Sequence, residues 1–237
     1  MSRVPTNVSF EEWVRLVFEH PVAREEWYWA VDSDTFERDP VRLVAYSTRL
    51  FEESAVVLAP YTDEQVDQGL WFLVGSPSEL DVLGVDAIPL PDRLNCIRSI
   101  FILFERCFAE RCTPFLSHID EQGVRPMNSI CFMWWDLFWH LFALWRDPDF
   151  VRKIPEPYRL QVANENEIDE ACISVMETTL ELPSVACQES ALHGLGHWGE
   201  FQKERCRGVI ASFLERHQDV RPGLRKYALQ AQEANLL

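Results

Sequence analysis

The chain has few glycines, no apolar run long enough to cross a bilayer, and none of the common short catalytic motifs. Nine glycines in 237 residues disfavour folds built from many tight turns. The most apolar stretch, 130–145, is shorter than the roughly 20 residues that a bilayer span needs, and it contains Asp136 and His140. Glycine-rich phosphate loops, Ser-x-Gly elbows, HExxH and calcium-binding loops are missing from the sequence. These absences argue against a turn-rich β fold and a membrane span, and they make an enzyme less expected.

The cysteines do not form a recognisable framework. No CxxC pair occurs among the seven of them, and most lie in apolar helical patterns. A disulfide framework or a cysteine-rich zinc cluster needs closer, paired spacing. The N-terminal segment has no apolar run typical of a signal peptide. We therefore expect a cytoplasmic protein whose cysteines are small buried side chains.

Acidic side chains outnumber basic ones, most strongly in the first part of the chain. The net charge is −16; residues 1–90 carry 17 acidic and 6 basic side chains, and residues 91–237 carry 21 and 16. Such a surface repels phosphate backbones, so nucleic-acid binding is not expected. The charge suits a basic protein partner, although solubility alone also accounts for it.

Helix start signals recur along the chain. Ser9-x-x-Glu12 is a capping box that predicts a helix from Phe10 to about Glu19. Asp39 before Pro40 predicts a helix that extends to Leu58, and Thr62-x-x-Gln65 predicts the next one. Further apolar patterns of helical period predict helices at 92–111 and from Asn128 onward. Because no segment alternates convincingly between apolar and polar residues, we expect an all-α fold.

Two segments near the C-terminus repeat at a nearly constant offset. The apolar pattern of residues 172–180 recurs 34 positions later, at 206–214, and the pattern of 187–191 recurs 33 positions later, at 220–224. A period of this size is typical of stacked helical hairpins that bury their apolar faces against one another. The repeat predicts four helices, at roughly 167–182, 184–199, 203–217 and 220–234.

The repeated segments resemble a known family. The sequence Cys187-Gln188-x-x-Ala191-x-x-Gly194-Leu195-Gly196-x-Trp198 is similar to the second helix of HEAT-like repeats, and Val220-Arg221-x-x-Leu224-x-x-Tyr227-Ala228 matches the start of the same pattern. The resemblance covers about 70 residues and implies a curved protein-binding scaffold. In the deoxyhypusine hydroxylase type of this repeat, His-Glu pairs hold two iron ions. Here Glu189-Ser190 and Pro222-Gly223 stand at those positions, so the resemblance does not imply that chemistry.

These patterns divide the chain into three parts. Residues 1–145 form an N-terminal helical part with a Trp-rich central helix, and 146–166 form an irregular connection that is rich in proline and charge. Residues 167–237 hold the two HEAT-like hairpins. We expect the parts to pack as one continuous unit, an irregular helical array. The pattern leaves open whether residues 1–90 are further degenerate repeats or a separate unit.

The first candidate site is a stripe of Glu189, His193 and His197, spaced at i, i+4 and i+8. At 100° per residue the stripe lies away from the face that carries the apolar residues of this helix, so we expect it to face solvent or a groove. Two histidines at i, i+4 can share a metal ion, with a third ligand that the sequence does not identify. The competing and favoured interpretation is an exposed polar stripe with a local Glu–His contact.

The second candidate is Asp136 and His140, one turn apart in the Trp-rich helix. A carboxylate beside an imidazole is an acid–base pair in principle, and burial would shift both pKa values. Polar groups inside so aromatic a helix must also be satisfied, and i, i+4 spacing lets these two satisfy each other. We therefore favour a structural role for a buried polar pair.

Two further groups are candidate interface residues. Trp27, Tyr28 and Trp29 are adjacent aromatics that either anchor a partner or close one end of the core. The basic residues Arg221, Arg225 and Lys226 could bind the acidic N-terminal part of the same or another molecule.

The sequence thus favours a non-enzymatic, all-α protein that binds a protein partner, possibly a basic one, without a cofactor. The alternative is a metal-dependent enzyme that uses His193 and His197 with one divalent transition metal ion. A third option is a structural subunit whose aromatic surface is buried in an oligomer. The partner and the oligomeric state are left open.

Overall fold

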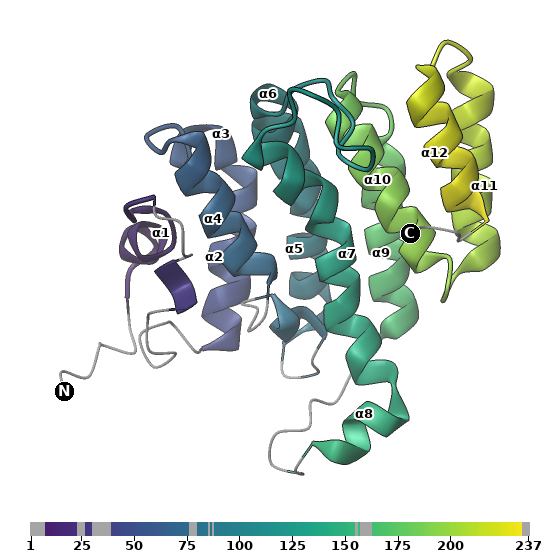
Figure 1. Cartoon of the computed structure of the whole chain (residues 1–237). Helices are drawn as coiled ribbons and strands as arrows, with labels where there is room; N and C mark the ends of the chain where they lie inside the picture. Colours follow the sequence, from purple (N-terminus) through teal and green to yellow (C-terminus); the bar gives the residue numbers. More distant parts are fainter. Residues whose placement is uncertain are drawn as a thin grey trace.

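A computed structural model describes residues 8–22, 27–29, 39–75, 80–84, 86, 88–154, 156 and 163–233. These ranges contain helices and loops but no strand, which confirms the all-α prediction (Figure 1). Among the described residues, no helix combines the length and apolarity needed to cross a membrane.

Within the described residues, α9 (Glu165–Thr179) packs with α10 (Val185–Trp198) and α11 (Lys203–Arg216) packs with α12 (Pro222–Gln232), as two consecutive hairpins. The long helices α2 (Pro40–Glu52), α4 (Asp63–Val74), α5 (Leu90–Leu103) and α7 (Pro126–Arg146) precede them. Helices α4, α7, α10 and α12 pack side by side in one layer, and α2, α5 and α9 do so in the other (Figure 1). Helix α1 (Phe10–Phe18) lies against α4 at one end, and α11 packs on α10 and α12 at the other. The helices described within residues 8–75 therefore pack onto the same array.

The helix starts follow from local capping chemistry. The Ser9 hydroxyl accepts a hydrogen bond from the backbone N–H of Glu12, whose carboxylate in turn accepts one from the backbone N–H of Ser9. Thr62 and Gln65 make the same reciprocal pair at the start of α4. Asp39 accepts from the backbone N–H of Val41 before α2. Each cap satisfies donors that a helix cannot pair internally.

Two helices that the sequence predicts as continuous are interrupted. The helix expected from Asp39 to Leu58 breaks at Glu53 and resumes as the single turn α3 (Ser54–Val57). The helix expected at 92–111 contains a π-helical turn, Phe104–Phe108, before α6 (Ala109–Arg111). The remaining short elements are η1 (Trp27–Trp29), η3 (Asp81–Gly84) and α8 (Pro148–Lys153).

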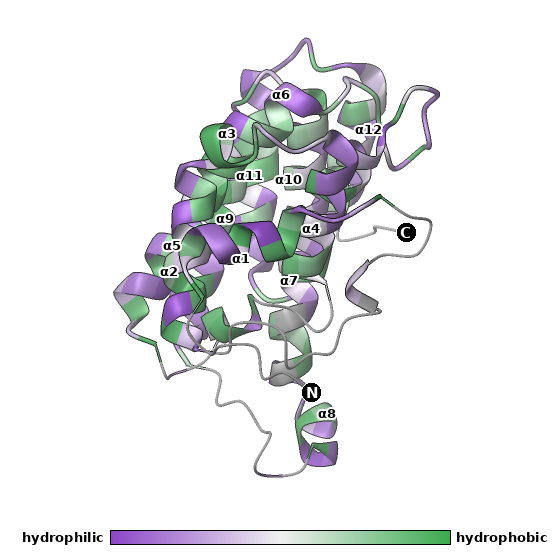
Figure 2. Cartoon of the chain, turned by 90° about the vertical axis from the view of Figure 1, so that its left-hand side faces the viewer, coloured by the Kyte–Doolittle hydropathy of each residue, from purple (hydrophilic) through white to green (hydrophobic). Residues whose placement is uncertain are grey.

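A single hydrophobic core runs through the array from α1 to α12. Figure 2, viewed from the α1 end, colours the ribbon by residue hydropathy and shows hydrophobic and hydrophilic stretches in the same helices, as in α1 and α2. The largest fully buried side chains include Trp13 in α1, Trp134 and Trp135 in α7, and Phe213 in α11. The segment 146–166 thus connects two parts that share one core, and it includes helix α8.

Helix α10 packs closely against both α7 and α9 at Gly194. A methyl group built on Gly194 would lie 2.4 Å from Met176 Sδ in α9 and 2.5 Å from Trp135 Cβ in α7. Only glycine leaves room for this approach. The close contact fixes the spacing between α7 and α10, and these two helices carry the polar residues described next.

Candidate functional site

The stripe on α10 is buried, so the expectation that it faces solvent is wrong. Glu189 is fully buried and His193 is 5% exposed, whereas His197 keeps 25% of its side-chain exposure. The apolar pattern of α10 indicates only one side that faces the core, but in the structure α10 is covered by α7, α9, α11 and α12. The loop between α6 and α7 also reaches across to α10 (Figure 1).

Glu189 does not pair with the histidines of its own helix. Its carboxylate accepts hydrogen bonds from the backbone N–H groups of Ser117, at 2.9 Å, and His118, at 3.0 Å. A third contact joins Glu189 Oε1 to Nδ1 of the His118 ring at 2.6 Å. The favoured interpretation of a local Glu–His contact within the stripe is therefore wrong, because a loop about 70 residues earlier in the chain supplies the partners.

The residue that joins His193 and His197 is Asp136 of α7. One potential ligand atom from each of the three lies within 4.8 Å of the other two. Nε2 of His197 is 3.2 Å from Asp136 Oδ1. This carboxylate stands where the sequence analysis left a third candidate ligand unidentified. The histidine pair and Asp136 were each singled out from the sequence, but the sequence does not show that α7 and α10 bring them together.

His140 lies at the edge of this cluster. Its Nε2 is 3.8 Å from Asp136 Oδ1, and its side chain is 55% exposed. The expectation of a buried Asp136–His140 pair is wrong, because the first partner of Asp136 is His197 on the neighbouring helix and His140 points towards solvent. His140 is nevertheless close enough to exchange a proton with a molecule bound beside Asp136.

Aromatic rings and one hydroxyl enclose the two histidines. Nδ1 of His193 is 2.5 Å from the hydroxyl of Tyr227 in α12, and the Phe132 ring stacks on His193 with centroids 4.1 Å apart. The Trp139 ring lies 5.3 Å from the ring of His197. The His193 and His197 rings meet edge to face at 4.7 Å. Each imidazole is therefore held in a defined orientation.

Burial disfavours the protonated form of both imidazoles. Desolvation lowers the pKa of His193 to about 3, helped by the nearby His197 and His118 rings. Burial also lowers the pKa of His197, against the opposing effect of Asp136. Desolvation, with Glu189 and Asp136 nearby, raises the pKa of the Tyr227 hydroxyl well above its usual range. A neutral imidazole is the form of histidine that binds metal ions.

The donor set fits a borderline metal ion. Nε2 of His193 and Nε2 of His197 are buried and make no hydrogen bond within the described residues, and Asp136 offers an anionic oxygen beside them. Two imidazoles and one carboxylate suit zinc, iron or manganese, and three protein ligands leave a coordination position open. The Asp136 and His197 side chains are 13% and 25% exposed, so this part of the cluster is in contact with solvent.

The other candidate residues are placed elsewhere. The Trp27 ring stacks on His20 at 3.8 Å and packs near Phe72, and Tyr28 also contacts Phe72. These two aromatics therefore pack against the core at the α1 end. The side chain of Trp29 lies outside the described residues.

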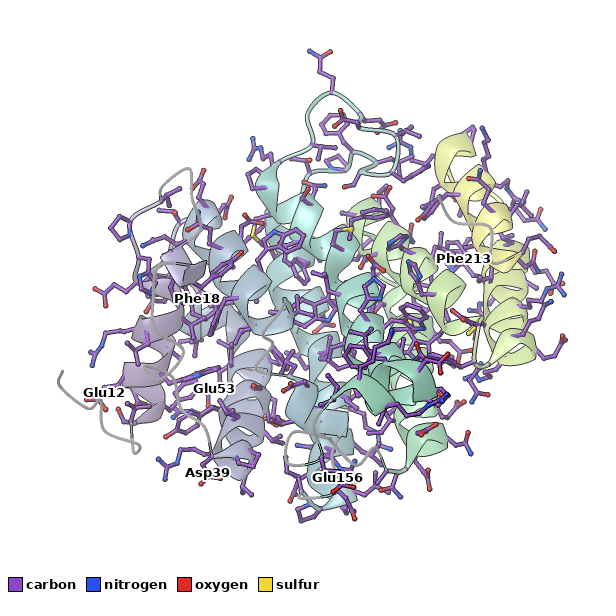
Figure 3. All side chains as sticks on the ribbon, turned by 60° about the horizontal axis from the view of Figure 1, so that its bottom comes forward. Glu12, Phe18, Asp39, Glu53, Glu156 and Phe213 are labelled. Atoms are coloured by element: carbon purple, nitrogen blue, oxygen red, sulfur yellow. The ribbon has the colours of Figure 1, made fainter. Side chains whose placement is uncertain are left out.

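The basic residues of the last hairpin do not bind the acidic N-terminal helices of their own chain. Arg221 contacts Glu121 at 2.6 Å and the Pro114 carbonyl at 2.9 Å, and Arg225 donates to the carbonyl of Leu214. That version of the prediction is wrong for these two residues, because α12 lies at the opposite end of the array from α1. The labelled residues Glu12 and Phe213 mark these two ends in Figure 3. Lys226 is exposed.

A separate groove runs between α2 and α5 on the other layer. Its volume is about 390 Å³, and its lining combines apolar residues with charged and polar ones. The lining residues are Val41, Val44, Ala45, Thr48, Arg49, Glu52, Ile88, Asp92 and Asn95.

Comparison with known proteins gives no relative for this chain: no protein family, no curated protein and no solved structure matches it. Any function therefore has to be argued from the residues themselves.

Proposed function

We propose that the protein binds one divalent transition metal ion through Asp136, His193 and His197. The observation that carries this proposal is the convergence of one potential ligand atom each from two imidazoles and a carboxylate, all within 4.8 Å of one another. Nε2 of His197 lies 3.2 Å from Asp136 Oδ1, and Nε2 of His193 is buried without a hydrogen bond among the described residues. A buried polar atom without a partner is costly, and a metal ion bound to Nε2 of His193 would remove that cost. Neighbouring side chains also orient the two imidazole rings: Tyr227 contacts Nδ1 of His193, and the Trp139 ring lies 5.3 Å from that of His197. Such contacts are usual for histidine ligands of metal ions.

The arrangement favours a hydrolytic centre over a purely structural one. Structural zinc sites are closed by four protein ligands, whereas catalytic sites keep one position for water or substrate. A metal ion held by Asp136, His193 and His197 would supply the chemistry of such a site, the activation of water for hydrolysis. The exposed His140 imidazole, 3.8 Å from Asp136, could carry a proton between this site and solvent.

Metal binding is tested on protein purified without a histidine tag and stripped with a chelator. Zinc is then titrated in competition with a chromophoric chelator, and the bound metal is counted by elemental mass spectrometry. We expect one zinc ion per chain, and at least tenfold weaker binding in both Asp136→Asn and His193→Ala, because each removes a ligand.

The matched control is His217→Ala. His217 lies 3.1 Å from Glu181, which resembles the 3.2 Å between His197 and Asp136, but it lies outside the cluster. This variant should bind zinc like the wild type. Wild-type protein with no bound metal, or equal zinc loss from His217→Ala and His193→Ala, would remove the proposal.

A second proposed function is protein binding, which the groove between α2 and α5 favours. A lining that combines apolar residues with charged and polar ones is common in protein recognition surfaces, and the net charge of −16 suits a basic partner. A helical array of the HEAT-like kind would present this surface. Ala45→Trp fills the groove, whereas Val56→Trp changes the exposed α3 outside it. A partner captured in a pull-down at low salt should be lost in the first variant and retained in the second. Equal capture by both would contradict groove binding.

A further inference from the structure

The outer contacts of His193 come from a different hairpin and from a distant loop. Tyr227 belongs to α12, is 5% exposed, and places its hydroxyl 2.5 Å from Nδ1 of His193. Within the described residues, Nδ1 of His193 makes its hydrogen bond with Tyr227. One proposed metal ligand on α10 is thus oriented by the last helix of the array.

This contact allows Nε2 of His193 to be the nitrogen that binds a metal ion. A neutral imidazole carries one proton, on either Nδ1 or Nε2. When Nε2 binds a metal ion, Nδ1 carries the proton and needs an acceptor. The Tyr227 hydroxyl can donate or accept, so its oxygen can serve as that acceptor. Without it, the protonated Nδ1 would be buried and unpaired, and the metal-binding tautomer would lose its stabilisation.

Tyr227 is in turn held by the loop between α6 and α7. The His118 ring stacks on the Tyr227 ring with centroids 4.0 Å apart and an interplanar angle of 22°. Glu189 accepts hydrogen bonds from two backbone N–H groups of this loop, and it contacts the His118 ring. Arg221, one residue before α12, contacts the same loop at Glu121 and Pro114. The loop therefore fixes both the ring of Tyr227 and the start of its helix.

We infer that Tyr227 is a positioning residue of the metal site, held by His118 and Glu189, and that metal binding is linked to the docking of α12. This inference rests on the proposed function. A metal ion on His193 strengthens the contact between α10 and α12, and by linkage a firmly docked α12 strengthens metal binding. The last hairpin would then respond to the metal state of the protein.

The direct test removes one oxygen atom. Tyr227→Phe keeps the ring that stacks on His118 and removes the acceptor of His193. Removing an outer-shell partner of a metal ligand typically weakens binding about 10–100-fold. We expect a loss of zinc affinity in this range by chelator competition, and a shifted visible spectrum of the cobalt-substituted protein.

Tyr46→Phe is the matched control, because the Tyr46 hydroxyl donates to the Val8 carbonyl at 2.7 Å at the other end of the array. It should leave zinc affinity unchanged. Glu189→Gln should give a smaller loss than Tyr227→Phe, because Glu189 acts only through the loop.

A second measurement uses the unaltered protein and does not depend on whether a variant folds. Hydrogen exchange of the α12 amides should slow at least tenfold when zinc is added to the wild type, more than in α2 and α4. In Tyr227→Phe this difference should vanish.

The outcomes separate the two proposals. If the wild type binds no zinc, the proposed function fails. If zinc binds and Asp136→Asn abolishes binding, but Tyr227→Phe matches the wild type and α12 shows no zinc-dependent protection, the proposed function stands and this inference is overturned.

Discussion

Gly194→Ala tests whether the spacing between α7 and α10 supports both the fold and the metal site. The added methyl would lie 2.5 Å from Trp135 Cβ and 2.4 Å from Met176 Sδ. The methionine sulfur can move, but Trp135 Cβ is fixed to the backbone of α7, so the two helices must separate by roughly 1 Å to reach ordinary van der Waals contact. Overpacking of this kind costs about 1–3 kcal/mol.

Part of this cost is offset by helix propensity. Alanine is more favourable than glycine inside a helix by about 1 kcal/mol. We therefore expect Gly194→Ala to lower the free energy of unfolding by about 0–2 kcal/mol. Because Asp136 lies on α7 next to Trp135, and His193 lies on α10 next to Gly194, the separation also widens the metal site. Zinc affinity should fall about tenfold.

The assay is urea unfolding together with zinc competition, and Gly208→Ala in α11 is the control. A methyl group on Gly208 meets no atom within 4 Å. This variant should be more stable than the wild type by about 0.5–1 kcal/mol and bind zinc normally. If Gly194→Ala were as stable as Gly208→Ala and bound zinc with wild-type affinity, the packing argument would be refuted.

Two other substitutions test further parts of the fold. Burial raises the pKa of Asp81 to about 6, so its contribution to stability is complete below pH 4 and is lost as pH rises through about 6. Asp81→Asn should remove this pH dependence and raise the free energy of unfolding at pH 7.5 by about 1–2 kcal/mol. Urea unfolding at pH 4.5 and 7.5 measures both effects. The same pH profile in the variant and the wild type would contradict the raised pKa of Asp81. Asp169 accepts two hydrogen bonds from Arg146, at 3.1 and 2.8 Å, and one from the Trp198 indole at 3.1 Å. Asp169→Asn removes the buried anion beside the largely buried Arg146 guanidinium and leaves it only the more exposed Glu165, 3.6 Å away, so we expect a loss of about 3 kcal/mol in thermal unfolding. A loss below about 1 kcal/mol would show that the pair contributes little.

The helices were largely predictable because their signals are local. The capping pairs at Ser9 and Thr62 act over three residues, and the structure places both helix starts where these pairs predict them. The 34-residue offset likewise predicted α9 to α12 to within a few residues at each end. The π-helical turn at Phe104–Phe108 was missed, because an apolar pattern on a wide stripe does not show the insertion of one residue.

The site was predictable only in its pieces. His193 and His197 share one turn spacing, and Asp136 was singled out as a polar residue in an aromatic helix, but no local pattern connects them. Their meeting depends on the packing of α10 on α7 at Gly194. The burial of Glu189 depends on a loop about 70 residues away in the chain. A helical wheel of α10 describes only that helix, so it cannot show that a distant loop packs over Glu189.

The most direct test of the metal centre is anomalous diffraction from crystals grown with zinc, measured on both sides of the zinc absorption edge. The account predicts one strong anomalous peak per chain, bonded to Nε2 of His193 and Nε2 of His197 at about 2.0–2.1 Å and to a carboxylate oxygen of Asp136. The His193 Nδ1 should remain on Tyr227. No peak between α7 and α10, or a peak only at surface residues such as His217 and Glu181, would contradict it.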